Sequence, residues 1–189
     1  MQNVTVIPFE DSVKNNKDAN LFNKVWAAAK NDDVRENFMF WSDDQVLTDY
    51  LDLTEAPIVF NPRGLKYFQE GPEKSKWQER MKHTLEYIQE KTHIVLPYNY
   101  DSHVPSPYKK REVNRIFPLL DYNTLPGLCI NTAYYGMQEV KAIDQRMVKH
   151  TLEGQQKPLG IPSKLLTYLG YDDGTWAAGL AMFLLGFFY

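Results

Sequence analysis

Residues 56–96 have the sequence APIVFNPRGLKYFQEGPEKSKWQERMKHTLEYIQEKTHIVL, and this stretch decides the predicted fold. The run 56–60 is short, apolar and partly β-branched, and turn-forming residues follow it at 61–64, so it predicts a buried strand. A long helix is predicted from 72 to about 91, because apolar side chains recur there at helical spacing: Trp77, Met81, Leu85 and Ile88. The apolar run 93–96 predicts a second strand. Strand, helix and strand in this order indicate a parallel βαβ unit.

Toward the N-terminus the pattern predicts one further strand and a helical region. The strand is expected at 3–9, which is β-branched and precedes polar residues. A helix is expected at 18–30, with Asp18 available as the N-cap, and 32–41 is expected to continue it after a break. Ser42 and Gln45 form a capping-box pattern, which predicts a third short helix.

Toward the C-terminus a proline- and tyrosine-rich loop is expected at 97–108, followed by a short helix at 109–117 and irregular chain at 119–130. A second long helix is predicted over 131–153, and a proline-bracketed linker leads to a brief helix ending at Gly170. The expected fold class is α/β: a small parallel or mixed sheet with helices, plus a hydrophobic C-terminal helix. The α/β body is expected to span 1–157, and the linker with the C-terminal helical segment 158–189.

The segment 174–189 departs most from the rest of the composition. It has no charged residue, and 12 of its 16 positions are apolar. A helix of about 15 residues spans only ~22 Å, whereas the hydrocarbon core of a bilayer is about 30 Å thick. Three environments could therefore bury the apolar surface of this helix: the protein's own core, a partner chain, or a membrane surface. The residues expected at that interface are Trp176, Leu180, Phe183, Phe187 and Tyr189.

Composition excludes several classes of protein. The chain has 189 residues, 43% of them hydrophobic and 24% charged, which is ordinary globular usage. A single cysteine, Cys129, excludes an intramolecular disulfide framework and a cysteine-based zinc cluster, and the four histidines are scattered. No metal site and no cofactor are expected, because nucleotide-binding fingerprints are also missing. The N-terminus has no signal-peptide pattern, so the cytoplasm is the default compartment.

The net charge of −3 does not favour a nucleic-acid partner. A small basic excess does occur in residues 71–120, which hold 9 basic and 6 acidic side chains. It includes the cluster formed by Lys109, Lys110, Arg111 and Arg115. We interpret this cluster as a solvated helix face.

Polar residues follow the predicted strands, and in open α/β sheets ligands bind outside the carboxyl ends of the strands. The candidate catalytic residues at these ends are Asp11, Arg63, Asp101 and His103. An Asp–His pair with a nearby arginine is suited to acid/base chemistry on an anionic substrate. The alternative is that these are solvated loop residues with turn-forming roles. A small α/β enzyme is therefore one functional hypothesis.

The leading hypothesis is a structural or interaction subunit of a larger assembly. Tyrosine-rich loops suit protein interfaces, and the loop 97–108 supplies Tyr98, Tyr100 and Tyr108. These tyrosines could equally pack in their own domain. Together with the apolar C-terminal helix, they predict protein partners or a homo-oligomer, with a membrane surface as a further candidate.

Overall fold

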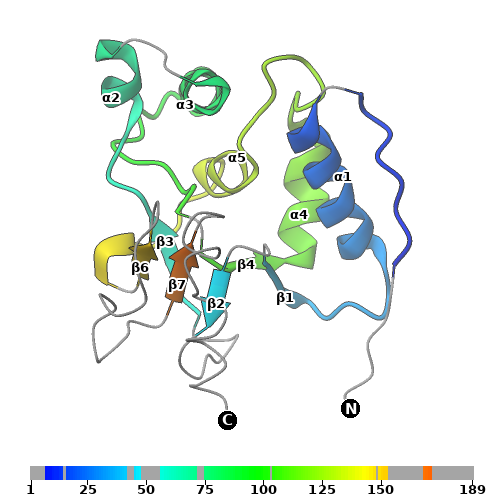
Figure 1. Cartoon of the computed structure of the whole chain (residues 1–189). Coiled ribbons are helices and arrows are strands. Elements are labelled where there is room, and N and C mark those ends of the chain that lie inside the picture. Colours follow the sequence, from blue (N-terminus) through cyan, green and yellow to red (C-terminus); the bar gives the residue numbers. More distant parts are fainter. Residues whose placement is uncertain are drawn as a thin grey trace.

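The computed structural model describes residues 7–14, 16–41, 45–47, 56–71, 75–102, 104–147, 149–152 and 168–171. This part of the chain is a mixed α/β structure, with its helices on one side of several short strand pairs (Figure 1). The α-helices are α1 (Lys17–Lys30), α2 (Leu65–Glu70), α3 (Lys76–Thr92), α4 (Lys110–Ile116) and α5 (Ile130–Gly136). Short 3-10 helices follow at Phe117–Leu119 and Gln145–Met147. The predicted hydrophobic C-terminal helix lies outside the described residues.

The described strands form three small sheets. The strands are β1 (Asn37–Phe40), β2 (Gln45–Leu47), β3 (Ile58–Phe60), β4 (Ser106–Lys109), β5 (Ala142–Asp144), β6 (Lys149–Leu152) and β7 (Tyr168–Tyr171). β1 pairs with β4 in antiparallel fashion, and β3 pairs with β5 in parallel. In the third sheet β7 lies between β2, antiparallel to it, and β6, parallel to it.

Capping residues mark the ends of the two long helices. Asn16, and not Asp18, caps α1, because its Oδ1 accepts a hydrogen bond from the N–H of Ala19 at 3.0 Å. Ser75 caps α3 by accepting from the N–H of Gln78 at 3.2 Å. His93 ends α3 in the left-handed conformation, with φ of 61°. The helices predicted over 18–30, 109–117 and most of 72–91 are therefore confirmed.

The predicted βαβ unit is wrong in its second strand. Residues 93–96 form no strand, because the left-handed His93 turns the chain and leaves Ile94 and Val95 49% and 57% exposed. The parallel partner of β3 is β5, with Val59 opposite Ile143. The chain after α3 instead makes an isolated antiparallel bridge between Asn99 and Asn61. Strand β3 itself agrees with the prediction for 56–60.

Other helical predictions also fail where the chain forms strands. α1 ends at Asn31, whose side chain accepts from the N–H of Asp33 at 2.8 Å, and the chain then enters β1. The short helix predicted from Ser42 is replaced at 45–47 by β2. The long helix predicted over 131–153 ends at Gly136, because residues 142–144 pair with β3.

Two short predicted elements at the ends of the chain differ as well. The strand predicted at 3–9 is not formed in its described part, 7–9, and its other residues lie outside the described chain. Residues 168–171, predicted as the end of a brief helix, form β7. β7 belongs to the segment 158–189, and it pairs with strands from the expected body.

Aromatic rings form the centre of the core. Tyr108 stacks on Tyr134, with ring centroids 4.4 Å apart, and it also contacts Tyr135. Phe117 contacts Tyr134 and joins this group to Phe22 of α1 at a centroid distance of 5.0 Å. Aliphatic side chains of α3 complete the core: Met81, Leu85 and Ile88. The apolar stripe predicted on α3 is thus buried, although Trp77 at its end is only half-buried.

A close backbone approach fixes α2 against the chain that follows α3. The N–H of Leu65 donates to the carbonyl of Leu96 at 3.3 Å, and Gly64 precedes it as the N-cap. A Cβ atom on Gly64 would lie 2.3 Å from the carbonyl carbon of Pro97. Because the obstacle is backbone, the side chains around it cannot relieve the clash.

We therefore expect Gly64→Ala to lower the free energy of unfolding by about 3 kcal/mol, the upper end for an overpacked site. Gly71→Ala is the matched control, since the nearest atom to its Cβ would be 3.8 Å away. Urea unfolding followed by circular dichroism measures both. Equal stability of the two variants would contradict the close approach at Gly64.

Candidate functional site: an ionic cluster and an open strand edge

The described members of the predicted catalytic set make no contact with one another through their side chains. Asp11 pairs with Lys24 at 2.7 Å and is 58% exposed in its side chain. The guanidinium of Arg63 lies over the ring of Tyr67, 5.1 Å from its centroid. The carboxylate of Asp101 accepts a hydrogen bond from the indole N–H of Trp77. His103 lies outside the described residues.

Asn99 nevertheless brings the backbones of Arg63 and Asp101 close together. Its side-chain amide donates to the carbonyl of Arg63 at 2.7 Å, and its Oδ1 accepts from the N–H of Asp101 at 2.9 Å. Asn99 is fully buried. The sequence analysis grouped Arg63 and Asp101 because both follow predicted strands. Their backbones do lie close together, but their side chains contact different partners.

The predicted interface tyrosines divide between core and surface. Tyr100 and Tyr108 are only 2% and 1% exposed, so they pack within this chain and are not accessible to a partner. Tyr98 is half-buried and stacks on Phe60 at a centroid distance of 4.5 Å. The five interface residues predicted between 176 and 189 lie outside the described chain.

A half-buried ionic cluster that the sequence analysis did not identify joins three segments of the chain. We define the Arg80 cluster as Asp18, Trp77, Arg80, Asp101 and Cys129. Arg80 pairs with Asp18 of α1 at 2.6 Å, and its Nε donates to the carbonyl of Pro126 at 3.2 Å. The side chains of Arg80 and Asp18 are 22% and 14% exposed. Arg80 therefore connects α1 and α3 to the loop before α5.

Local structure explains how the loop reaches Arg80 and Cys129. Gly127 has φ of 87°, a left-handed conformation that favours glycine, and the chain turns there. Beyond this turn, the N–H of Cys129 donates to the hydroxyl of Thr84 on α3 at 2.9 Å. A charged residue at position 80, within the apolar stripe of α3, is the sequence signal that identifies the cluster.

Burial opposes the charged forms of Asp18 and Cys129 in this cluster. Burial raises the pKa of Asp18, against the effect of Arg80 and with a further contribution from Asp101. Burial also raises the pKa of the Cys129 thiol well above its usual range, and Asp101 and Asp18 reinforce the shift. Because a nucleophilic cysteine requires a thiolate, Cys129 is not activated. The geometry fits a structural clamp better than a catalytic centre.

A different feature, the outer edge of β1, has unpaired backbone groups. In an antiparallel pair, bonded and non-bonded residue pairs alternate. The N–H of Lys110 donates to the carbonyl of Glu36 at 2.8 Å, and Met39 lies opposite Pro107, which has no N–H. It follows that Phe38 and Phe40 bond to β4, whereas the N–H and C=O groups of Asn37 and Met39 point away from it. Within the described part of the chain, these groups have no hydrogen-bond partner.

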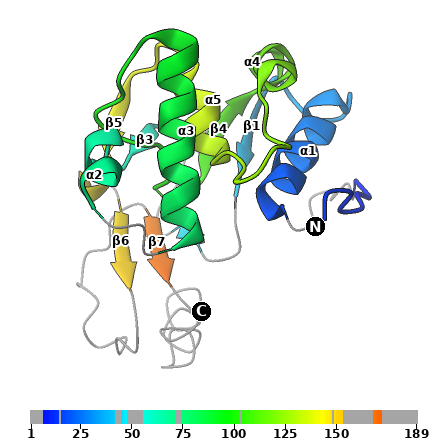
Figure 2. The ribbon, with the colours of Figure 1, turned by 90° about the horizontal axis from the view of Figure 1, so that it is seen from above.

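The outer edge of β4 is occupied, in contrast to that of β1. The hydroxyl of Tyr134 accepts from the N–H of Lys109 at 3.2 Å, and the hydroxyl of Tyr135 donates to the carbonyl of Pro107. β1 is thus the outermost strand, on the side of β4 away from β3 and β5 (Figure 2). An unprotected edge of this kind is a template for pairing with another chain.

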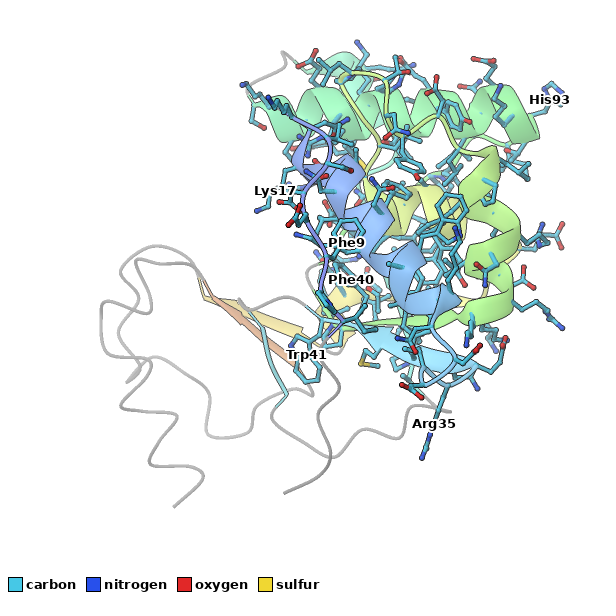
Figure 3. All side chains as sticks on the ribbon, turned by 90° about the vertical axis from the view of Figure 1, so that its right-hand side faces the viewer. Phe9, Lys17, Arg35, Phe40, Trp41 and His93 are labelled. Carbon is cyan, nitrogen blue, oxygen red and sulfur yellow. The ribbon has the colours of Figure 1, made fainter. Side chains whose placement is uncertain are left out.

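Large aromatic side chains flank this edge. Trp41, which directly follows the strand, is 42% exposed, and its neighbour Phe40 is half-buried. Figure 3 labels Phe40 and Trp41 near one end of the molecule, with Trp41 beyond Phe40. We define the β1 surface as the strand Asn37–Phe40 and Trp41. It combines unpaired backbone with exposed aromatic area, which are both typical of docking surfaces.

Two comparisons with known proteins found no match. No protein-family model matches the chain, and no curated protein matches its sequence. None of the described helices has the length and apolar character needed to cross a membrane. Across the described residues, no three His, Cys, Asp or Glu side chains are grouped so that they could hold a metal ion.

We expect Arg80→Met to lower the free energy of unfolding by about 2 kcal/mol, because it leaves the half-buried Asp18 without its cation. The matched control is Arg146→Met. Arg146 also pairs with an aspartate, Asp144, but its side chain is 74% exposed, so we expect a clearly smaller loss of stability. Urea unfolding measures both. A loss in the control as large as that in Arg80→Met would contradict the clamp.

The pH dependence of stability tests the burial of Asp18. Its pKa is raised in the folded protein, so the folded state binds the proton more tightly than the unfolded state. Stability from this group is fully present below its ordinary pKa of 3.8 and is lost as the pH rises through the raised value. We therefore expect the wild type to lose stability relative to Asp18→Asn as the pH rises through that window.

Asp144 should show the opposite dependence of stability on pH in the same experiment. A hydrogen bond from Arg146 lowers the pKa of Asp144, so its contribution is present above the ordinary value and is lost as the pH falls. The wild type should accordingly gain stability relative to Asp144→Asn as the pH rises. Thermal unfolding between about pH 3 and pH 7 gives both curves. The same sign for the two substitutions would refute the assignment.

Proposed function

We propose that this protein is a structural or interaction subunit of a larger protein assembly, and that it binds a partner chain through the β1 surface. The observation that carries the proposal is the unprotected edge of β1, where the backbone groups of Asn37 and Met39 have no partner within the described chain. Main-chain hydrogen bonds to such an edge give affinity, and neighbouring side chains give specificity.

Exposed aromatic residues support the same proposal. Trp and Phe supply large apolar contact areas, and truncation of such residues dominates the energetics of many interfaces. Trp41 directly follows β1, and its side chain is 42% exposed (Figure 3). The tyrosine loop contributes less than its sequence indicates, because Tyr100 and Tyr108 are buried.

The described geometry gives no comparable support to the acid/base enzyme. Asp11, Arg63 and Asp101 have different side-chain partners, and the Cys129 thiol is held in its protonated form. An interaction role through the apolar segment 174–189, with a partner chain or a membrane surface as its cover, stays a prediction from sequence.

The mass of the native protein in a cell extract tests the proposal. We expect the protein to migrate well above its chain mass of 22.1 kDa, with no change when a mild detergent is added. Trp41→Ala should shift most of it to the monomer mass, because it removes an exposed aromatic contact from the β1 surface. Analytical size exclusion with mass detection makes the measurement.

Tyr67→Ala is the matched control. Tyr67 is an equally exposed aromatic residue, 49% accessible, but it belongs to α2. The control should retain the large species, and thermal unfolding verifies that both variants are folded. A wild-type protein that is monomeric in the extract would overturn the proposed function, and dissociation by detergent alone would point to a membrane surface.

A further inference from the structure

We propose that the partner at the open edge of β1 is a second copy of this chain. The two β1 strands pair in antiparallel fashion about a two-fold axis, which makes one four-stranded sheet in the order β4-β1-β1-β4. This inference rests on the proposed function and deepens it, because it names the partner of the β1 surface and the register of pairing.

Self-pairing is favoured by the chemistry of the strand. β1 has the sequence NFMF, with no proline, no charged residue and no bulge, which are the devices that normally protect an edge. The chain does protect the other edge of this sheet, with the hydroxyls of Tyr134 and Tyr135. When two β1 strands pair about a two-fold axis, the open backbone groups of each copy find partners in the other copy. Two-fold symmetry of this kind is the commonest among homo-oligomers.

The directions of the backbone groups limit the register. A bonded pair must join two residues whose groups point outward, and within β1 these are Asn37 and Met39. Asn37 opposite itself would leave Met39 opposite Arg35, and Met39 opposite itself would leave Asn37 opposite Trp41. Both alternatives use a residue outside the strand. Only Asn37 opposite the partner's Met39 satisfies all the outward groups of β1 within β1.

This register also produces complementary side-chain contacts. It aligns Arg35 with the partner's Trp41, twice by symmetry. Both residues are exposed, and they are labelled at the same end of the molecule in Figure 3. A guanidinium over an indole face is a favourable cation–π pair. Phe38 then lies on the axis, opposite the partner's Phe38, where it extends the aromatic face that already contacts Tyr108.

The first experiment measures the mass of the purified full chain at several concentrations. The wild type should show a concentration-dependent species of twice 22.1 kDa. Met39→Pro should abolish it, because proline removes the outward N–H and adds bulk at the edge while the bonds of Phe38 and Phe40 to β4 remain. Met39→Leu is the matched control and should keep the dimer. Circular dichroism verifies that the proline variant is folded.

The second experiment reads the register without depending on the proline variant. Asn37→Cys and Met39→Cys chains, carrying different tags, are oxidised separately and as a mixture. Residues in a bonded antiparallel pair have Cα atoms about 5.5 Å apart, within the range of a disulfide. The mixture should therefore give a cross-linked heterodimer, and each variant alone little product. Cys129 does not interfere, because it is only 4% exposed.

The outcomes separate this inference from the proposed function. If the pure protein stays monomeric while the cell extract contains a large species, the partner is not a second copy of this chain. The proposed function is then unaffected. A dimer unaffected by Met39→Pro, or cross-linking of Asn37→Cys or Met39→Cys mainly with itself, overturns the pairing described here. A monomer in both the pure sample and the extract overturns both.

Discussion

The burial of tyrosine hydroxyl groups is the constraint on which the arrangement of strands depends. Tyr108 is 1% exposed, so its hydroxyl needs an internal partner, and it donates to Oδ1 of Asn131 at 2.7 Å. The hydroxyls of Tyr134 and Tyr135 bond instead to the backbone of β4. These three tyrosines hold β4 against α5, and Tyr134 and Tyr135 occupy backbone groups of β4 that another strand would need. Because β4 cannot accept a strand on that side, the outer edge of β1 is the edge of this sheet that stays open among the described residues.

A second constraint joins the helices to this framework. Arg80 bonds to Asp18 on α1 and to the carbonyl of Pro126, so one side chain positions a helix and a loop relative to α3. Burial of the pair has a desolvation cost, and the raised pKa of Asp18 shows that Arg80 does not fully offset it. The apolar core of α3, Met81, Leu85 and Ile88, supplies most of the stabilisation.

Local patterns predicted the parts of the fold whose stability is local. The apolar stripes of α1 and α3 and the short run at β3 agree with the structure, since each depends on one buried face. Residues 93–96 and 131–153 show where such patterns fail. The first has strand-like residues, but a left-handed His93 exposes them, and the second has helical spacing, but long-range pairing with β3 overrides it.

At the candidate sites, Asp101 was identified from its position after a predicted strand. The edge of β1 was not identified, because residues 32–41 were interpreted as helix. Whether a strand lies at an edge also depends on which strands pair with it, and the sequence of the strand alone does not show this.

The energetics of an open edge explain why the β1 surface needs its aromatic residues. Exposed N–H and C=O groups of Asn37 and Met39 bond to water in the free protein, so pairing replaces bonds and does not create them. Each exchanged hydrogen bond contributes only about 1 kcal/mol net, and four of them cannot by themselves offset the loss of translational and rotational freedom on association. Apolar area must supply the remainder, and the exposed area of Trp41 lies directly after the strand. The backbone edge therefore sets the register of binding, and the aromatic side chains determine its strength.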